Sequence, residues 1–442
     1  MNPLERLSAL VEAARRAGAD QADALLVESM SLSAQRRLGR LEQLERAEGL
    51  DLGLRVFVGQ RVAVVSSTRA DPAGFAALAE RAVAMARVVP EDPFAAIPDP
   101  EPVPDAAPLE LEDPTEPAAD ALIARAAAAE EAALAVRGVT NSEGAEAGWS
   151  RTRVALVTSR GFAGCWSRSS HSVSVTVLAG QGSAMERDYD YAVAVHLADL
   201  EDPAAIGRRA GEAAVARLHP RRPATARLPV VYHPRVAGSL LAHLAAAANG
   251  AAVARGTSFL KDSLGRQVLA PGLAVFDDAT RRRGLRSRPF DGEGTPSRPL
   301  TLVEDGVLRS WLLDGRSARQ LGLSSTGHAG RGTGGPPGPT STNLWLAPGR
   351  LSPEALIADI REGLYVTELI GMGVNPVTGD YSRGAAGFMI RGGALAEPVN
   401  EITIAGRLQE MFLHMTPADD LVFRRGIDAP TIRIEGMVMA GA

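Results

Sequence analysis

The fold of the first part of this chain is indicated by residues 52–64, which read LGLRVFVGQRVAV. Apolar residues occupy every second position up to Val58, and the alternation resumes at Val62 after Gly59-Gln60. Alternation with a period of two is typical of a strand that buries one face. The stretch therefore predicts two antiparallel strands joined by a tight turn.

Helices are predicted on both sides of these strands. Leucine, valine and alanine recur at helical spacing over residues 4–14. Asp71 suits the N-cap and Pro72 the first turn of a second helix, which is expected to end near Val89. Residues 1–89 are therefore expected to form one unit of helix, antiparallel strands and helix.

The same outline recurs over residues 118–220. A helical pattern comes first, alternating valines indicate strands from Val173 onward, and Asp202-Pro203 opens a closing helix. The two closing helices have similar sequences, with AERAVA at residues 79–84 and GEAAVA at residues 211–216. We interpret this as a duplicated unit, with chance similarity in an alanine-rich chain as the alternative.

Residues 90–117 break this pattern. Prolines recur through the segment, interleaved with aspartate and glutamate. Such a composition is typical of an extended, largely solvated linker. We therefore interpret the segment as an acidic, proline-rich connector between the two units.

Residues 221–442 have a different character. A short buried strand followed by a helix is expected over residues 227–248, and Asp305-Gly306 indicates a two-residue hairpin turn. Residues 386–439 are predicted to form short strands with glycine turns. Together these patterns predict an α+β fold dominated by antiparallel strands.

Composition limits the function classes. The chain has 442 residues, 45% hydrophobic and 22% charged, with a formal net charge of −5, which argues against a general nucleic-acid binder. Cys165 is the only cysteine, which excludes an intramolecular disulfide and a cysteine-based zinc site. The N-terminus shows no signal-peptide pattern, and the uncharged stretch 236–254 lacks the bulk of a membrane span, so a cytoplasmic protein is expected.

Patterns for nucleotide binding and serine chemistry are weak. Residues 330–335 read GRGTGG, but the prolines that follow prevent the helix that a dinucleotide site needs, so a flexible loop is expected. No G-x-S-x-G elbow occurs. Residues 324–328 place hydroxyl groups beside His328, but adjacent loop residues rarely form a triad. Backbone capping or contacts with a substrate strand are favoured there.

Metal and acid–base chemistry are no better supported. None of the seven histidines belongs to an H-E-x-x-H or H-E-x-x-x-H pair, and His243 stands alone on an apolar helix. The arginines of residues 281–288 suit a solvated loop or an acidic partner surface. Asp291 and Glu293 could do acid–base work, but their glycine neighbours suit a tight turn equally well.

Several segments carry a further signal when they are taken together. They are Gly238–Leu244, Ser258–Gly265, Pro289–Gly294, Asp305–Leu308, Ser317–Arg319, Ser325–Gly330, Val374–Phe388 and Glu401–Gly406. This set resembles the TldD/PmbA family, once described as modulators of DNA gyrase, and its PmbA/TldE branch in particular. The resemblance spans nearly the whole chain.

The resemblance implies a fold and a zinc chemistry. The fold is a duplicated helix–antiparallel strands–helix N-terminal region plus a C-terminal domain on a curved, mostly antiparallel sheet. In the catalytic TldD branch a helix carries H-E-x-x-x-H and a later cysteine adds a ligand. Here Ala242 and Ala247 replace the histidines, His243 occupies the glutamate position, and no cysteine lies near the C-terminus. No catalytic residue and no zinc are therefore expected in this chain.

The resemblance further implies a partner. A heterodimer is expected in which a TldD-type subunit holds the zinc and cleaves unfolded or modified peptides, while this chain completes the peptide chamber. Residues 326–335 and 379–387 are predicted to contact the partner or an extended peptide by strand addition. The candidate surface residues are Ser325, Thr326, Gly327, His328, Gly379, Asp380, Tyr381, Ser382, Arg383 and Gly384.

Two alternatives remain open. The first is a stand-alone hydrolase that uses His328 with Asp380 or Ser382. Activity of the purified lone chain that chelators do not reduce would favour it. The second is a non-enzymatic peptide-binding or regulatory protein that has no peptidase partner.

Overall fold

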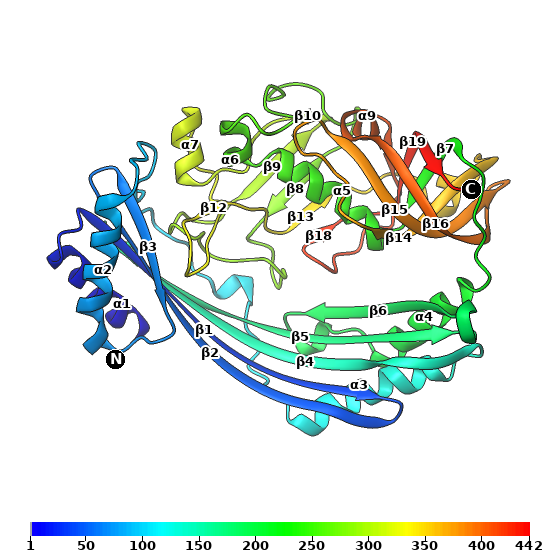
Figure 1. Ribbon diagram of the computed structural model, residues 1–442, viewed down its shortest axis with the longest axis horizontal. Coiled ribbons are helices and arrows are strands. Elements are labelled where there is room, and N and C mark those ends of the chain that lie inside the picture. The colour runs from blue at the N-terminus through cyan, green and yellow to red at the C-terminus, as the bar shows by residue number, and fades with distance from the viewer. Residues whose placement is uncertain (1) are drawn as a thin grey trace.

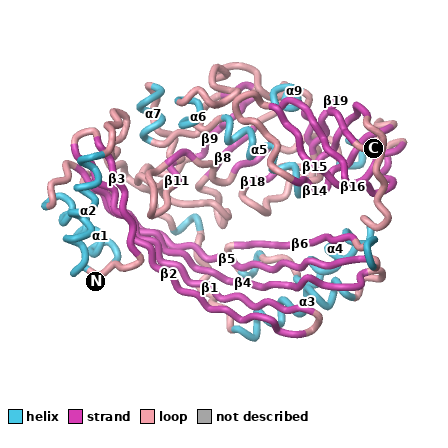
Figure 2. Tube along the Cα trace, viewed as in Figure 1, coloured by secondary structure: helices cyan, strands magenta, loops and turns pink. Residues whose placement is uncertain are grey.

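The computed structural model describes residues 2–442. These residues form two layers (Figure 1). The N-terminal half forms a long curved sheet with helices on its outer face (Figure 1). The C-terminal half forms a second layer, rich in short strands and loops, that lies inside the curve of this sheet (Figure 2).

One antiparallel sheet contains both helix–strands–helix units. The first unit comprises α1 (Pro3–Arg16), β1 (Gln21–Arg37), β2 (Arg40–Val58), β3 (Arg61–Ser67), a 3₁₀ turn (Pro72–Gly74) and α2 (Phe75–Val88). The second comprises α3 (Ala119–Leu134), β4 (Val139–Thr158), β5 (Ala163–Ala179), β6 (Glu186–Ala194) and α4 (Pro203–Ala216). The strand order is β3-β2-β1-β4-β5-β6, so the units join where β1 pairs with β4. The predicted duplication is confirmed.

Local chemistry explains where these helices begin. Asn2 caps α1 in a reciprocal capping box with Glu5. Asp202 caps α4 just ahead of Pro203, as predicted. Asp71 caps the 3₁₀ turn instead, so the predicted second helix becomes α-helical one turn later than expected. Over residues 2–442, none of the helices is both long enough and apolar enough to cross a membrane.

The long strands make the two units share their cores. Ala155 and Val157 of β4 pack in the core under α1 and α2, while Leu32 and Ala34 of β1 pack in the core under α3 and α4. Full burial of a leucine or valine side chain stabilises a fold by about 1.5–3 kcal/mol. Each unit therefore depends on the other for part of its stability.

The connector is not a free linker. Residues 90–117 are mostly irregular, as expected, but Ile97, Leu109 and Leu111 are buried. The backbone N–H of Ser169 on β5 donates to the Leu111 carbonyl at 3.0 Å. The prediction of a largely solvated segment is wrong for these apolar residues, because the neighbouring surfaces offer them both burial and backbone partners.

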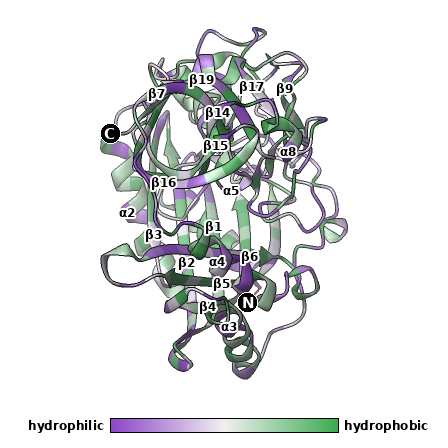
Figure 3. Ribbon diagram, turned by 90° about the vertical axis from the view of Figure 1, so that its right-hand side faces the viewer, coloured by the Kyte–Doolittle hydropathy of each residue, from purple (hydrophilic) through white to green (hydrophobic). Residues whose placement is uncertain are grey.

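The second layer is built around a small closed ring of strands (Figure 3). The strands β16-β15-β14-β7-β19-β17 pair in that order. An additional β16–β19 pairing closes the ring, and β17, paired with β19 alone among the described strands, lies outside it. The strands are β7 (Ala226–Tyr232), β14 (Glu362–Ile370), β15 (Asp380–Arg391), β16 (Ala394–Arg407), β17 (Met415–Pro417) and β19 (Ile432–Ala440). Only the β7–β14 pair of this sheet is parallel, so the predicted mostly antiparallel character is confirmed.

A second sheet and five helices complete this layer. The sheet has the order β10-β9-β8-β13-β18. Its strands are β8 (Val275–Asp278), β9 (Pro299–Glu304), β10 (Val307–Leu308), β13 (Leu344–Leu346) and β18 (Ile427–Asp428), and β11 (Ala329–Gly330) pairs separately with β12 (Gly338–Pro339). The helices are α5 (Pro234–Ala247), α6 (Gly250–Ala254), α7 (Gly315–Leu321), α8 (Pro353–Ile357) and α9 (Leu408–Leu413).

Two local predictions for this layer can be compared with the structure. The hairpin turn at Asp305-Gly306 is present, with φ of 50° and 74°, the left-handed conformation that suits a two-residue hairpin turn. Residues 386–439 are not uniformly short strands, because β15 and β16 contain 12 and 14 residues. Strands in a closed ring pair with a neighbour on each side, and this pairing favours longer strands. The local sequence pattern did not indicate that length.

Candidate functional site

Helix α5 carries the predicted positions Ala242, His243 and Ala247. Its N-terminus is capped by His233, whose Nδ1 accepts a hydrogen bond from the backbone N–H of Arg235 at 3.0 Å. The helix packs against β13, β14 and β18, which buries one face in the core of the second layer. Ala247 lies in that core, whereas Ala242 and His243 are half-buried on its flank.

Strand β15 presents a tyrosine and an arginine to His243. The rings of His243 and Tyr381 meet edge to face with their centroids 6.0 Å apart. The Tyr381 hydroxyl lies 3.5 Å from the Tyr232 hydroxyl, and both phenols are buried. Burial lowers the pKa of His243, and the charge of Arg383 lowers it further. His243 is therefore neutral at pH 7, and its Nε2 has no hydrogen-bond partner within residues 2–442.

The donors on α5 do not fit a zinc ion. A catalytic zinc needs three protein ligands, and the methyl groups of Ala242 and Ala247 supply none. His243 offers one imidazole nitrogen. In the described part of the chain, no group of three or more His, Cys, Asp or Glu side chains is placed to hold a metal ion.

His328 lies in a buried hydrogen-bond network. Its Nε2 is 3.2 Å from Asp277 Oδ1, and its Nδ1 is 2.8 Å from the Thr326 carbonyl oxygen. The hydroxyls of Ser325 and Thr326 donate to one backbone carbonyl at 3.3 and 3.2 Å. These contacts match the predicted backbone capping. The structure pairs His328 with Asp277, not with the β15 side chains that the stand-alone hydrolase would use.

In the second glycine-rich stretch, residues 379–387, the backbone is already hydrogen-bonded to neighbouring segments of the same chain. Its backbone pairs with β16 from Asp380 onward and with β14 from Gly384 onward, and the Ser382 N–H donates to the preceding loop at 2.7 Å. Strand addition needs free backbone groups, so the prediction of strand addition at this stretch is wrong. Asp380 and Ser382 remain exposed, and Arg383 is half-buried. The predicted surface residues that the structure buries are Gly327, His328, Gly379 and Tyr381.

The stretch at residues 330–335 is a loop, but it is docked rather than flexible. The Arg331 guanidinium is fully buried and lies 2.6 Å from Asp23 of β1. A side chain at Gly53 would collide with the Thr333 backbone, so the loop lies directly on the sheet. The predicted loop is present, but its contact with a distant strand was not predicted, because such a contact leaves no local pattern.

Arg331 belongs to a buried charge cluster between the two layers. Arg55 of β2 donates to Asp23 at 2.9 Å and lies 3.6 Å from Glu293, and all four side chains are at most 5% exposed. Burial raises the pKa of Glu293 to about 7, although Arg55 opposes this shift. Asp291 instead accepts N–H groups of its own turn, as the tight-turn alternative predicted.

The arginines of residues 281–288 meet the acidic connector. Arg282 and Arg283 each donate to the Glu110 carboxylate at 2.7 Å. The Arg281 guanidinium lies 3.5 Å from the centroid of the Phe423 ring. The acidic surface that this basic run contacts is therefore a segment of the same chain.

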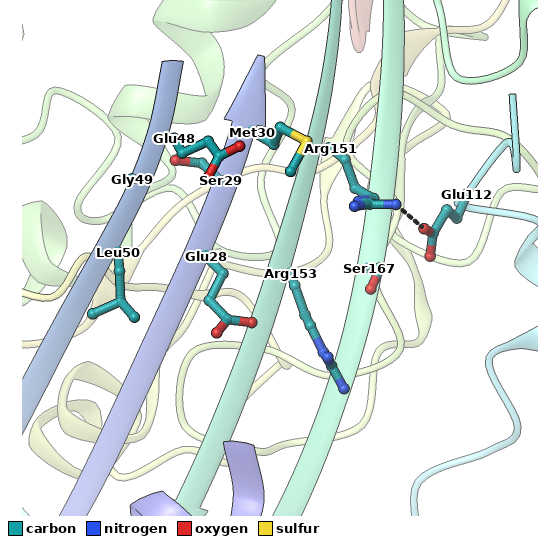
Figure 4. A pocket seen from close by; sticks show the side chains of 10 residues that line it. All are labelled: Glu28, Ser29, Met30, Glu48, Gly49, Leu50, Glu112, Arg151, Arg153 and Ser167. Carbon is teal, nitrogen blue, oxygen red and sulfur yellow. Dashed lines mark ion pairs between the residues drawn. The ribbon is translucent and has the colours of Figure 1, made fainter. Parts of the chain in front are cut away.

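A polar hollow opens on the helix-bearing face of the curved sheet, between the two helix pairs. Its volume is about 710 Å³, and side chains of β1, β2, β4 and β5 line it together with Glu112 of the connector (Figure 4). Arg151 approaches Glu112 at 3.9 Å, while Glu28 and Arg153 occupy paired positions on β1 and β4. No predicted site residue lies here, and charges of both signs favour no single class of ligand.

Models of one metallopeptidase family match most of the chain. The PmbA/TldA metallopeptidase domain 1, central domain and C-terminal domain match residues 22–86, 112–218 and 225–441. The metalloprotease PmbA of Escherichia coli O157:H7 is 36% identical over 96% of this chain and 92% of its own length. A metalloprotease PmbA homolog of Haemophilus influenzae is 34% identical over 99% of this chain and 96% of its own length. The chain belongs to the TldD/PmbA family.

Solved structures share the whole fold. A proposed modulator of DNA gyrase from Bacteroides thetaiotaomicron matches with a TM-score of 0.90 at 24% identity, over 99% of this chain and 98% of that chain. TldE from Thermococcus kodakarensis matches with a TM-score of 0.87 at 20% identity, over 99% of this chain and all of that chain, 100%. At these identities the likeness establishes the fold alone, including its curved, mostly antiparallel sheet.

Proposed function

We propose that this chain is the non-catalytic, TldE-type subunit of a zinc peptidase whose metal is held by a TldD-type partner. The observation that carries the proposal is the side-chain chemistry of α5. Ala242, His243 and Ala247 stand where the catalytic branch is expected to carry H-E-x-x-x-H. Without those histidines and the glutamate, the helix lacks both the ligands and the general base of a zinc peptidase.

An exposed apolar loop beside this position is our candidate partner surface. Residues 371–379 join β14 to β15, and Val374 forms a bridge with Tyr381, the residue that contacts α5. Met372 is 90% exposed and Ile370 is 58% exposed. Neighbouring apolar side chains that remain this exposed are typical of a surface that a partner covers.

The site supports a role in holding peptide rather than in cleaving it. His243 is neutral and half-buried, with an unpaired Nε2 that can accept or donate a hydrogen bond depending on its tautomer. Arg383 adds a positive charge beside it. The half-buried Arg383 can bind a backbone carbonyl or a carboxylate of an extended peptide while the partner's zinc acts on the scissile bond, whereas the protein itself covers the His243 Nε2. Unfolded or modified peptides, including precursors that are trimmed to maturity, are the substrate class we propose.

Co-expression with the TldD-type relative from the same genome tests the proposal. Size exclusion, zinc analysis and a peptidase assay should show a complex that contains about one zinc per heterodimer, as one catalytic site requires. We expect activity only when both chains are present. Peptide cleavage by the lone chain in the presence of a chelator would overturn the proposal and favour a stand-alone hydrolase.

Met372→Asp tests the loop as the partner surface. A charge buried in an apolar interface is costly, so we expect the affinity of the complex to fall at least about tenfold. Val88→Asp is the matched control, because Val88 is 82% exposed on α2. Calorimetric titration of the two subunits measures both variants. If the two substitutions have equal effects, the loop is not part of the interface.

A further inference from the structure

A cavity lies where the first unit, the connector and the second layer meet. Its volume is about 440 Å³. Strand β3 and the end of α2 form one wall, residues 90–96 of the connector form a second, and α7 with the loop at residues 334–337 forms a third. Arg55 of β2, Glu293 and Asp314 complete the lining. None of its lining residues belongs to α5 or β15, so the cavity is distinct from the candidate peptide site.

Apolar groups make up most of the cavity wall. Val62 and Val64 line it from β3, Met85 lines it from α2, and Pro90 and Pro337 lie at its margins. Water gains few hydrogen bonds in such surroundings. A concave space of this size, mostly apolar with a few polar groups, is typical of a site for a small organic molecule.

One guanidinium group in the wall is available to a ligand. Arg319 of α7 donates through Nε to the Phe94 carbonyl at 2.5 Å and through Nη2 to the Ala96 carbonyl at 3.1 Å. These bonds hold the connector but supply no negative charge. Within residues 2–442, no carboxylate lies within 4.0 Å of the Arg319 guanidinium, and its Nη1 makes no hydrogen bond. Burial lowers the pKa of this guanidinium, and Glu293, Asp314 and Asp92, which lie farther away, raise it less strongly.

The other charged groups of the wall already have partners. Arg55 pairs with Asp23, and Arg316 pairs with Asp92 at 2.6 Å. Asp314 accepts the Ser317 N–H at 2.8 Å as the N-cap of α7. Glu293 accepts the backbone N–H of Gly315 at 2.7 Å. Arg319 is therefore the cation that a ligand can neutralise.

We propose that this cavity binds a small apolar molecule that ends in a carboxylate. The carboxylate lies on Arg319 Nη1, and the apolar part lies against Val64 and Met85. A charge-assisted hydrogen bond to a partly desolvated guanidinium is roughly twice as strong as a neutral one, so the charge of the ligand determines its affinity. The same chemistry is offered by a free fatty acid and by the C-terminus of an apolar peptide.

Hexanoate and hexanamide test the role of the carboxylate at nearly constant shape. In calorimetric titrations of the full chain, we expect hexanoate to bind with a Kd below about 1 mM and hexanamide to bind at least about tenfold more weakly. Octanoate represents a free fatty acid, and N-acetyl-alanyl-leucine represents the C-terminus of an apolar peptide. The compound that binds more tightly identifies the natural class of ligand. Equal binding of hexanoate and hexanamide, or no binding of any of the four compounds, would overturn the proposal.

Val64→Phe fills the cavity and leaves Arg319 in place. We expect it to weaken hexanoate binding at least about tenfold while the melting curve stays cooperative. Val438→Phe is the matched control, because Val438 lies on β19, away from the cavity lining, and is 38% exposed. Arg319→Gln should abolish binding and Arg319→Lys should retain part of it. If Arg319→Gln unfolds the connector, Val64→Phe decides the question, and unchanged binding by a folded Val64→Phe variant would refute the site.

Discussion

The two units of the curved sheet hold the second layer with different chemistry. The first unit contributes Asp23 and Arg55 to a cluster in which every side chain is at most 5% exposed. The second unit contributes Asp188 of β6, which pairs with Arg217, the C-cap of α4, and with Arg235 of α5. Asp188 is itself only 2% exposed, but the two arginine side chains are 11% and 13% exposed, so water reaches the arginine side of the second contact and no part of the first.

This difference predicts how much stability is lost when one partner of each contact is removed. Removing one partner from a buried ion pair leaves an uncompensated charge and costs about 3–5 kcal/mol. Where water reaches one partner, the loss is smaller, because solvent replaces part of the lost interaction. Units with the same architecture therefore need not contribute equally to the stability of the whole molecule.

Asp23→Asn should have the largest effect on stability. It leaves Arg55 and Arg331 buried with only Glu293 to oppose them, so we expect the free energy of unfolding to fall by about 3–5 kcal/mol. Urea-induced unfolding measures this loss. Adding Arg331→Met to Asp23→Asn should recover part of it, because the second substitution removes one of the unpaired charges. A loss of less than about 1 kcal/mol would show that the cluster is not buried in solution.

Glu293→Gln should reveal a pH-dependent effect of intermediate size. The native carboxyl titrates at about 7 rather than at its usual 4.5, so the folded state holds the proton longer than the unfolded state. Its contribution to stability is therefore complete below about pH 4.5 and is lost as the pH rises through about 7. Relative to Glu293→Gln, the wild type should lose up to about 3 kcal/mol across this window.

Unfolding measurements at several pH values, made on both proteins, test this expectation. The difference between their free energies of unfolding should change between pH 5 and pH 8 in the stated direction. A constant difference would mean that Glu293 keeps the same charge throughout. The contact of the first unit would then be no more pH-dependent than the contact of the second.

Asp188→Asn should have the smallest effect. Asp188 is buried, but Arg217 keeps Glu368 at 2.5 Å and both arginines retain some access to water, so we expect a loss of about 1–2 kcal/mol. The same urea unfolding series provides the comparison. A loss as large as that of Asp23→Asn would remove the distinction between the two units.

Part of the fold and of the candidate site could be read from local patterns. The capping pair Asp202-Pro203 predicted the start of α4, because a cap acts on backbone groups within the same turn. Arg55 gave a partial signal, since a charged residue between apolar neighbours on a strand must find a partner when it is buried. The partner itself could not be found, because Asp23 and Glu293 lie elsewhere in the sequence.

The sequence by itself determined the helices of the duplicated unit and helix α5, because each of these depends on the type and spacing of neighbouring residues. That zinc ligands are missing on α5 is what the resemblance to the family implies. The tertiary structure decided that β16 closes on β19, that Arg331 reaches Asp23, and that the connector is held by Arg282 and Arg319. These contacts join segments far apart in the chain, and they form only when the layers pack and desolvate the groups between them. Such contacts have no sequence period that could predict them.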